Sequence, residues 1–132
     1  KVPKSVETMI VNPGIQGLPS GLCEDCRSLR EVSLPAGLIM IGHLAFYKCL
    51  KLLEISICST VISIRTEAFN ECRSLTKVEF ESSPSSSPHQ LKRIGGHAFQ
   101  DCDSLQRIKP PSSVNMIGAN AFINCTDLVE AD

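Results

Sequence analysis

The chain has 132 residues, of which 42% are hydrophobic and 20% charged, and its formal net charge is −1. This length suits a single domain with a modest core, and the composition is ordinary for a globular protein. The near-neutral charge predicts no general attraction to nucleic acid or to an anionic membrane, and the apolar runs are too short for a membrane-spanning helix.

One short motif returns along the chain. Ala-Phe-x-x-Cys begins at Ala45, Ala68, Ala98 and Ala121, and a further cysteine, Cys26, precedes the first copy. The cysteines stand at positions 26, 49, 72, 102 and 125, so the steps between them are 23, 23, 30 and 23. A fixed period in this range is typical of a solenoid, in which each repeat buries its apolar side by stacking on its neighbours. We therefore predict one solenoid of about five 23-residue coils over residues 1–132.

The first part of the chain, up to position 17, allows two alignments with the repeats that follow. Residues 2–9 look like residues 34–41, although the two segments are offset by 32 and not by 23. A strict 23-residue register instead places Val6, Met9 and Val11 under Leu29, Val32 and Leu34. Both alignments keep the apolar residues inward, so the sequence leaves the register of this segment open.

Each full repeat then has three parts. A Leu-x-x-Val-x-Leu segment, such as Leu29 to Leu34, alternates at its end as a short half-buried strand does. An apolar-x-x-Ile segment follows, with a glycine after it at Gly42, Gly95 and Gly118, where a turn or a close backbone approach is expected. In Ala-Phe-x-x-Cys, the Phe and the Cys are three residues apart and would share one side of a 3₁₀ or helical turn.

The longer step, from Cys72 to Cys102, has a visible cause. Residues 81–90 form a Ser/Pro-rich stretch of ten residues where the earlier repeats use three. Such a composition cannot bury a core, so we expect a mobile surface loop inserted within one coil. Further along, Pro110 occupies the strand-end position of Phe80 and should weaken that strand.

These positions together resemble the BspA-type leucine-rich repeat. The resemblance rests on Leu-x-x-Val-x-Leu-Pro followed by Val-x-x-Ile-Gly-x-x-Ala-Phe-x-x-Cys-x-Ser-Leu and covers roughly residues 18–130. Departures are Cys23 in place of Phe, Lys51 in place of Ser, Arg65 in place of Gly, and the inserted loop. The resemblance implies a curved right-handed solenoid whose short parallel strands form a concave sheet. Members are often surface or secreted proteins thought to bind other proteins, which leaves a surface, secreted or cytoplasmic location open here.

The seven cysteines could indicate disulfides or zinc. Five of them occupy one repeated position, and side chains in such a column point the same way at about the strand spacing of 4.8 Å, too far apart for a disulfide. We therefore expect buried thiols. Cys23-x-x-Cys26 has the spacing of half a zinc site, but no second pair is present, so we predict no metal site. Cys58 lies outside the column and is either the most exposed thiol or a partly buried one in a turn.

Other motifs give little indication of function. Asn124-Cys125-Thr126 matches the glycosylation sequon, and we expect it to be unused unless the protein is secreted. The three histidines do not share a repeat position, and no nucleophile has a base at motif spacing. No glycine-rich phosphate loop follows a strand. We therefore predict no catalytic site and no cofactor.

The outward strand positions are the best candidates for a binding surface. Because Val32 and Leu34 face inward, stacking creates two outward columns that change from acidic or neutral to basic along the chain: Glu31, Glu54, Lys77 and Arg107 in one, and Ser33, Ser56, Glu79 and Lys109 in the other. Glu54 could pair with Lys77, and Glu79 with Lys109, in neighbouring coils. We predict a protein-binding face. The alternatives are a solvated face of self-neutralising charges and coils that act only as a spacer in a larger protein.

The chain begins without Met and stops soon after Leu128, so we interpret it as a piece of a longer repeat array.

Overall fold

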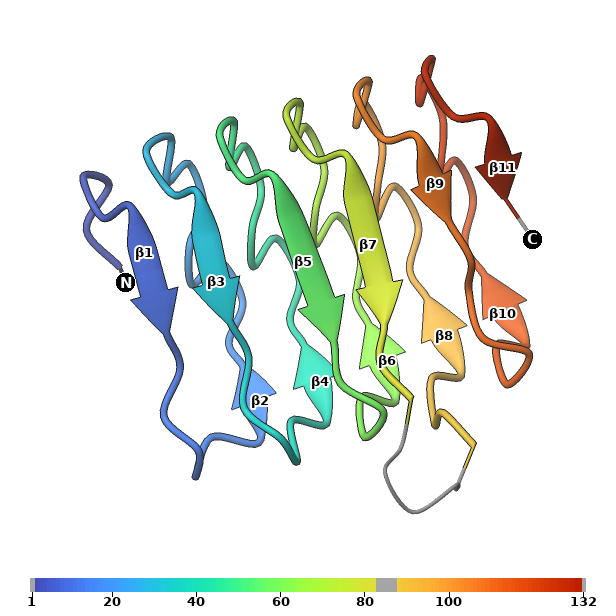
Figure 1. The fold of residues 1–132 in the computed structure, drawn as a ribbon, viewed down its shortest axis with the longest axis horizontal. Coiled ribbons are helices and arrows are strands. Elements are labelled where there is room, and N and C mark those ends of the chain that lie inside the picture. Colours follow the sequence, from blue (N-terminus) through green and yellow to red (C-terminus); the bar gives the residue numbers. More distant parts are fainter. Residues whose placement is uncertain (1, 83–87, 132) are drawn as a thin grey trace.

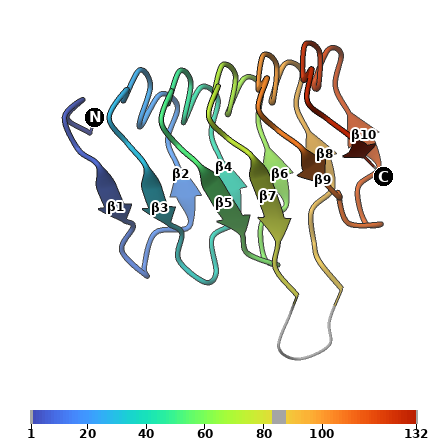
Figure 2. The same cartoon turned by 45° about the horizontal axis from the view of Figure 1, so that its top comes forward.

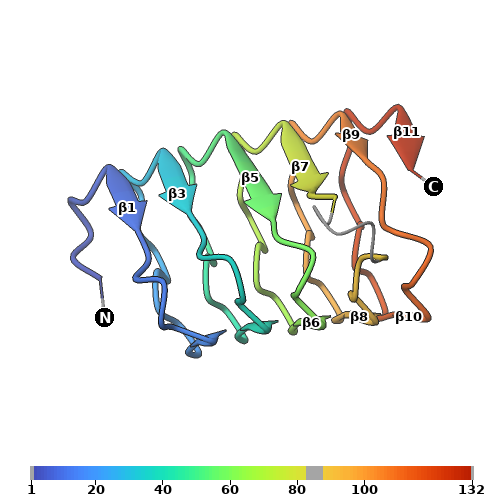
Figure 3. The ribbon, with the colours of Figure 1, turned by 60° about the horizontal axis from the view of Figure 1, so that its bottom comes forward.

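The structure is a computed structural model that describes residues 2–82 and 88–131. The chain winds as a solenoid with two layers of short strands (Figure 1). One layer contains the odd-numbered strands: β1 (Thr8–Ile10), β3 (Glu31–Ser33), β5 (Glu54–Ile57), β7 (Lys77–Phe80), β9 (Arg107–Ile108) and β11 (Glu130–Ala131). The other contains β2 (Gly17–Leu18), β4 (Met40–Ile41), β6 (Ser63–Ile64), β8 (Arg93–Ile94) and β10 (Met116–Ile117). Figure 3 shows the two layers from the side.

All strand pairs are parallel and are offset by one repeat. Met40 pairs with Ser63 across an ordinary repeat, and Ile64 pairs with Ile94 across the lengthened one. The strands β6 and β8, which precede and follow residues 81–90, are therefore neighbours in the same layer. Of the predicted loop at residues 81–90, residues 83–87 fall outside the part of the chain that the structure describes.

The first coil follows the strict register. Met9 lies beside Val32 in the β1–β3 pair, as that register requires, and the alternative alignment with residues 34–41 is therefore wrong. The predicted weakening by Pro110 is confirmed, because β7 contains four residues and β9 only two. Proline has no N–H with which to extend the ladder.

The predicted fold class is confirmed, and the Ala-Phe-x-x-Cys segments prove to be successive hydrogen-bonded turns. Ala45 N–H donates to the Gly42 carbonyl at 3.1 Å, and Cys49 N–H donates to the Phe46 carbonyl at 3.2 Å. The residues that precede Ala45 and Cys49, Leu44 and Lys48, have left-handed φ angles of 59° and 60°. A left-handed residue interrupts a right-handed helix, so these segments do not continue as 3₁₀ or α-helix.

These turns join the coils by lateral hydrogen bonds. Phe46 N–H donates to the Ala68 carbonyl at 2.7 Å, and Phe69 N–H donates to the Ala98 carbonyl at 2.8 Å. Such bonds recur at every seam from Cys23 to Ala121. In Figure 2 the turns stack along one edge of the solenoid, where they act as a third ladder beside the two strand layers. The left-handed residues aim N–H groups at the next coil, and the resulting bonds offset their conformational cost of roughly 1–2 kcal/mol each.

The repeated phenylalanines form a stack through the interior. The ring centroids of Phe46 and Phe69 are 5.2 Å apart, those of Phe69 and Phe99 are 5.1 Å apart, and those of Phe99 and Phe122 are 5.5 Å apart. The interplanar angles are 10° or less. Cys23 occupies the preceding Phe position and is fully buried, as the alignment predicts.

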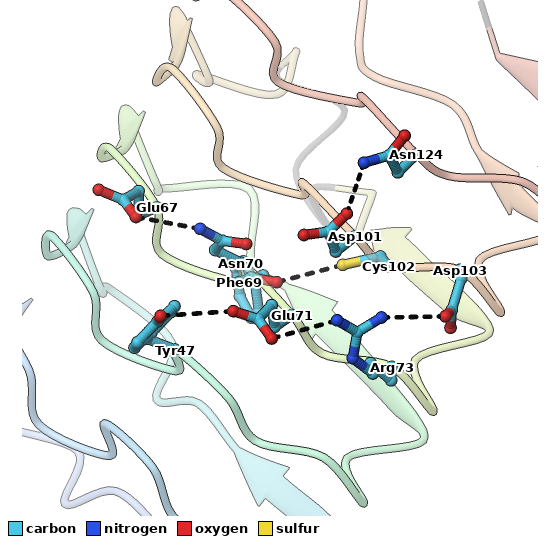
Figure 4. Close-up of polar contacts among 10 residues, drawn as sticks. All are labelled: Tyr47, Glu67, Phe69, Asn70, Glu71, Arg73, Asp101, Cys102, Asp103 and Asn124. Atoms are coloured by element: carbon cyan, nitrogen blue, oxygen red, sulfur yellow. Dashed lines mark hydrogen bonds and ion pairs between the residues drawn. The ribbon is translucent and has the colours of Figure 1, made fainter.

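The cysteine column lies beside this stack. All seven cysteines are reduced thiols, and those of the column are buried except Cys125, which is half-buried. Cys72 Sγ lies 3.2 Å from the Phe46 carbonyl oxygen, with the thiol as donor. Cys102 Sγ likewise donates to the Phe69 carbonyl oxygen at 3.1 Å, as Figure 4 shows. The prediction of buried thiols that act as weak donors is confirmed. Each thiol satisfies a carbonyl of the preceding coil, which a purely apolar side chain could not do.

The glycines after the Ile positions allow close approach of the coils. A Cβ atom at Gly95 would lie 2.5 Å from the Thr66 backbone nitrogen, and one at Gly42 would lie 2.3 Å from the Leu18 carbonyl oxygen. Both contacts are with backbone, which cannot swing aside as a side chain can. Of the two sequence-based explanations, close backbone approach is therefore the correct one for these glycines.

We expect Gly95→Ala to destabilise the solenoid by about 1–3 kcal/mol, because the added methyl group overpacks a seam between coils. The Gly95 N–H bond to the Ile64 carbonyl, at 2.8 Å, holds the coils at this separation. Urea unfolding measures the effect. Gly14→Ala is the control, because nothing lies within 4 Å of a Cβ atom there, and it should change stability by less than about 0.5 kcal/mol. Equal effects of the two substitutions would contradict the packing explanation.

Candidate partner-binding face

The odd-numbered strands present their polar side chains on one outer surface, which we call the odd-strand face. The eight predicted positions are all exposed, and β5, β7 and β9 bring their counterparts together in register. Glu54 lies beside Lys77, and Lys77 lies beside Arg107. The two columns are Glu31, Glu54, Lys77 and Arg107, and Ser33, Ser56, Glu79 and Lys109.

The charges on this face pair differently from the expectation. Lys77 Nζ lies 3.2 Å from Glu79 Oε1, so Lys77 pairs along its own strand and not with Glu54 of the neighbouring coil. Within the described residues, Lys109 makes no ion pair with Glu79. Because both side chains of the Lys77–Glu79 pair are more than half exposed, the pair contributes little to stability. Glu31 and Glu54, at the acidic end of the face, are therefore not neutralised by the basic residues at the other end.

Two shallow grooves lie on the odd-strand face. The first, of about 530 Å³, lies between β3 and β5 and reaches Glu81; the second, of about 650 Å³, lies chiefly along β7 and β9. The first groove is lined by three carboxylates and one guanidinium, a net charge of −2. The second is lined by three basic and two acidic residues, a net charge of +1. The predicted change from acidic to basic along the face thus coincides with two separate depressions.

The turn edge of the solenoid carries a polar network of its own (Figure 4). Glu71 accepts a hydrogen bond from Tyr47 Oη at 3.3 Å and pairs with Arg73 at 3.2 Å. Arg73 also pairs with Asp103 at 3.1 Å, so three coils are joined. These charged groups are satisfied by one another, which favours a structural role for this edge.

The sequon lies on the same edge. Asn124 is exposed, but its Nδ2 atom donates to Asp101 Oδ1 at 2.8 Å, and Cys125 beside it is half-buried. The amide nitrogen that a glycan would need is therefore already used in a bond between coils.

The Cys23 and Cys26 thiols interact with each other, and each also contacts a group outside the pair. Cys23 Sγ lies 3.6 Å from Met9 Sδ, and Cys26 Sγ lies 3.6 Å from the Val2 carbonyl oxygen. In the described ranges 2–82 and 88–131, no group of three His, Cys, Asp or Glu residues is placed to hold a metal ion.

Cys58 is buried, with 6% of its surface exposed, so the expectation that it is the most exposed thiol is wrong. Its Sγ atom donates toward the Pro35 carbonyl oxygen at 3.4 Å, and Thr60 Oγ1 lies 3.5 Å from the sulfur. A strand-end cysteine that replaces a proline thus faces inward, where carbonyl groups of the preceding coil accept hydrogen bonds from its thiol.

Cys23 and four thiols of the column are poor nucleophiles in this environment. Burial raises the pKa of Cys23 to about 12 and that of Cys125 to about 11, and it raises the pKa values of Cys49, Cys72 and Cys102 as well. Since the thiolate is the reactive form, these residues stay protonated and unreactive near neutral pH.

The histidines also serve local contacts. His43 Nδ1 lies 2.8 Å from the Thr66 carbonyl oxygen, and His97 Nδ1 contacts Gln100 Oε1. His89 stacks edge-on against Phe80, with ring centroids 5.7 Å apart. The three residues lie in separate places, as the sequence predicts from their different repeat positions.

No helix long and apolar enough to cross a bilayer occurs in the described part of the chain.

Known proteins share this repeat and this fold. The family model for the BspA type leucine-rich repeat region matches residues 16–132 in six copies. The crystal structure of the T. pallidum leucine-rich repeat protein is similar, with a TM-score of 0.86 and 32% identity over 98% of this chain and 59% of that chain. A leucine-rich repeat protein from Eubacterium ventriosum ATCC 27560 has a TM-score of 0.80 at 21% identity, over 95% of this chain and 32% of that one. A search of curated proteins finds no match.

The chain thus spans less than two thirds of the length of either solved relative. The family match covers nearly the whole chain, and the parallel coils with their Phe and Cys columns are the structural form of the same repeat. The chain belongs to the BspA-type leucine-rich repeat family.

Proposed function

We propose that this chain is a non-catalytic module that binds a partner protein through its odd-strand face. The observation that carries the proposal is the exposure of eight polar residues on one face of the solenoid, of which those on β5, β7 and β9 are held in register by strand pairing. A solenoid presents such a surface with little loss of entropy on binding, because its backbone is already ordered by the hydrogen bonds between its coils.

The charge distribution supports the same face. Glu31 and Glu54 lie toward the N-terminal end, and Arg107 and Lys109 toward the C-terminal end, all exposed. Opposite charges at opposite ends of a face orient a partner and speed its association. The polar groups of the turn edge, by contrast, satisfy one another.

A spacer role is the second candidate. The lateral hydrogen bonds that join every described coil would let these repeats transmit rigidity within a longer protein without binding anything. A spacer needs no particular surface charge. Substitution of exposed charged residues should therefore weaken partner binding by a binding module and leave a spacer unaffected.

Reversal of two charges distinguishes the two functions. We expect Glu54→Lys combined with Arg107→Glu, which leaves the net charge unchanged, to lower partner retention by about tenfold or more, corresponding to about 1.4 kcal/mol. The measurement is a quantitative pull-down with the immobilised chain from the source cells.

The control for this experiment is Arg93→Glu combined with Asp127→Lys, which exchanges exposed charges away from the odd-strand face. It should leave retention unchanged. If the reversed variant folds and retains the same proteins in the same amounts as the wild type, the odd-strand face is not the binding surface.

A further inference from the structure

The odd-strand layer is interrupted between β3 and β5. The strands β1 and β3 form a two-stranded sheet, and β5, β7, β9 and β11 form a separate four-stranded sheet. The space between β3 and β5 is visibly wider than the other spaces in this layer (Figures 1 and 3). The first groove lies at this interruption.

Hydrogen bonds confirm that this seam is looser than its counterparts. Leu53 N–H reaches the Arg30 carbonyl at 3.4 Å, whereas the same bond one coil later, from Thr76 to Leu53, is 2.8 Å long. At the other end of the strands, Glu81 N–H donates to the Ile57 carbonyl at 2.9 Å. Cys58 N–H and the Leu34 carbonyl are the equivalent groups one coil earlier, and within the described residues no hydrogen bond joins them.

The loosened seam exposes part of the interior. Val32 is only half-buried, whereas its counterparts Ile55, Val78 and Ile108 are 2%, 4% and 2% exposed. Val32 and Leu34 therefore give the groove an apolar floor, and Leu53, 50% exposed, adds an apolar wall.

Carboxylates surround this floor. Glu31 and Glu54 stand on the two strands that border the groove, and Glu81 stands at one end. All three are exposed, and Arg30 is the only basic residue among the lining residues. An apolar floor with an acidic rim is complementary to a segment that carries both aliphatic and cationic side chains, since Lys and Arg pack their carbon stems on apolar surface while the charge reaches the rim.

We propose that the groove between β3 and β5 binds a short extended segment of a partner protein that carries Lys or Arg beside an aliphatic residue. This inference rests on the proposed function and adds the position and the chemistry of the partner. The bordering strands have three and four residues, or roughly 10–13 Å of extended chain, so about four residues of the partner fill the groove. The neighbouring groove, with its net positive charge, selects against the same segment.

A phage-displayed library of random linear peptides tests the proposal directly. Selection on the full chain at low ionic strength should enrich sequences with Lys or Arg beside Leu, Ile or Val. A selected peptide is then synthesised with a fluorophore, and its affinity is measured by fluorescence anisotropy. We expect Glu31→Gln with Glu54→Gln to weaken it by about tenfold or more, and added salt to weaken it as well.

The matched control is Lys77→Gln with Glu79→Gln, which removes an exposed pair from the second groove. It should leave the affinity of the cationic peptide unchanged. All these positions are exposed, so the variants should fold, and circular dichroism checks that they do.

Three results would overturn the proposal: no enriched peptide, enriched peptides that are acidic, or a cationic peptide whose affinity survives the loss of Glu31 and Glu54. Enrichment of acidic peptides that lose affinity on Arg107→Gln would contradict the assignment to this groove. It would still support binding by the odd-strand face. The proposed function itself fails only if charge reversal leaves partner retention unchanged.

Discussion

Phe69→Ala should lower the free energy of unfolding by about 3–5 kcal/mol, the largest effect that we expect from any single substitution. The Phe69 ring is fully buried and stacked on both sides, 5.2 Å from Phe46 and 5.1 Å from Phe99. Its removal leaves a cavity at the middle of the stack and loses two aromatic contacts. Because domains of this size are stable by about 5–15 kcal/mol, the variant should be close to unfolding. Urea denaturation followed by circular dichroism measures the loss.

Phe122→Ala is the control for this substitution. Phe122 occupies the same repeat position, but it is half-buried and stacks on Phe99 alone. We expect a clearly smaller loss, because less apolar surface and one aromatic contact are removed. If both substitutions had the same small effect, the stack would not be the centre of the core.

Alkaline pH should unfold the protein steeply. Burial raises the pKa values of five thiols, Cys23 and four of the column, above the unfolded value of about 8.5–9, to about 11 at Cys125 and about 12 at Cys23. The folded state therefore binds these protons more tightly than the unfolded state. The resulting stability is fully present below about pH 9 and is lost as the pH rises toward 11–12. A fully buried thiol contributes about 1.4 kcal/mol per pH unit in this window. The half-buried Cys125 contributes less, because water screens its charge. The five thiols together can still remove a large share of the stability of the domain.

Urea midpoints measured between pH 8 and 11, in the presence of a phosphine reductant, test this linkage. We expect a constant midpoint up to about pH 9 and a steep fall beyond it. Cys102→Ala should start from a lower stability, because it leaves a small cavity, but should lose stability less steeply with pH. A midpoint that stays level up to pH 11 would show that the thiols do not remain protonated in the folded state.

The core residues could be predicted because the repeat determines which positions are buried. Phe46, Phe69 and Phe99 recur with the cysteines, and residues that occupy one repeat position must occupy one place in a stack of identical coils. The same reasoning placed Cys23 in a phenylalanine position, where it is buried. The outward columns could be predicted for a similar reason, since alternation in a strand decides which side chains face solvent.

The backbone of the turns could not be predicted in the same way. Of the nine described left-handed residues other than glycine, five are Asn, Asp or His, which favour positive φ, but the other four are Leu44, Lys48, Glu67 and Glu71, which do not. These conformations are selected by the lateral hydrogen bonds to the next coil, which involve main-chain atoms and leave no sequence pattern. The burial of Cys58 likewise depends on the carbonyl groups of Pro35 and Leu38 in the preceding coil.

The groove on the odd-strand face depends on the spacing between two coils, which the repeat pattern treats as uniform. Leu34 and Ile57 occupy equivalent repeat positions, yet within the described residues the odd-strand ladder is interrupted between β3 and β5 and continuous from β5 to β11. The exposed charges were therefore predictable one by one, and their arrangement around an apolar floor was not.

Thiol labelling of the native protein tests most directly whether the repeats stack into one dry interior. With a thiol reagent at mildly alkaline pH, followed by mass spectrometry, we expect Cys125 to react first, because it is half-buried and at the end of the column. The other six cysteines should react only after denaturant is added. Rapid labelling of all seven cysteines in the folded protein would contradict the stacked-coil structure and every inference that depends on it.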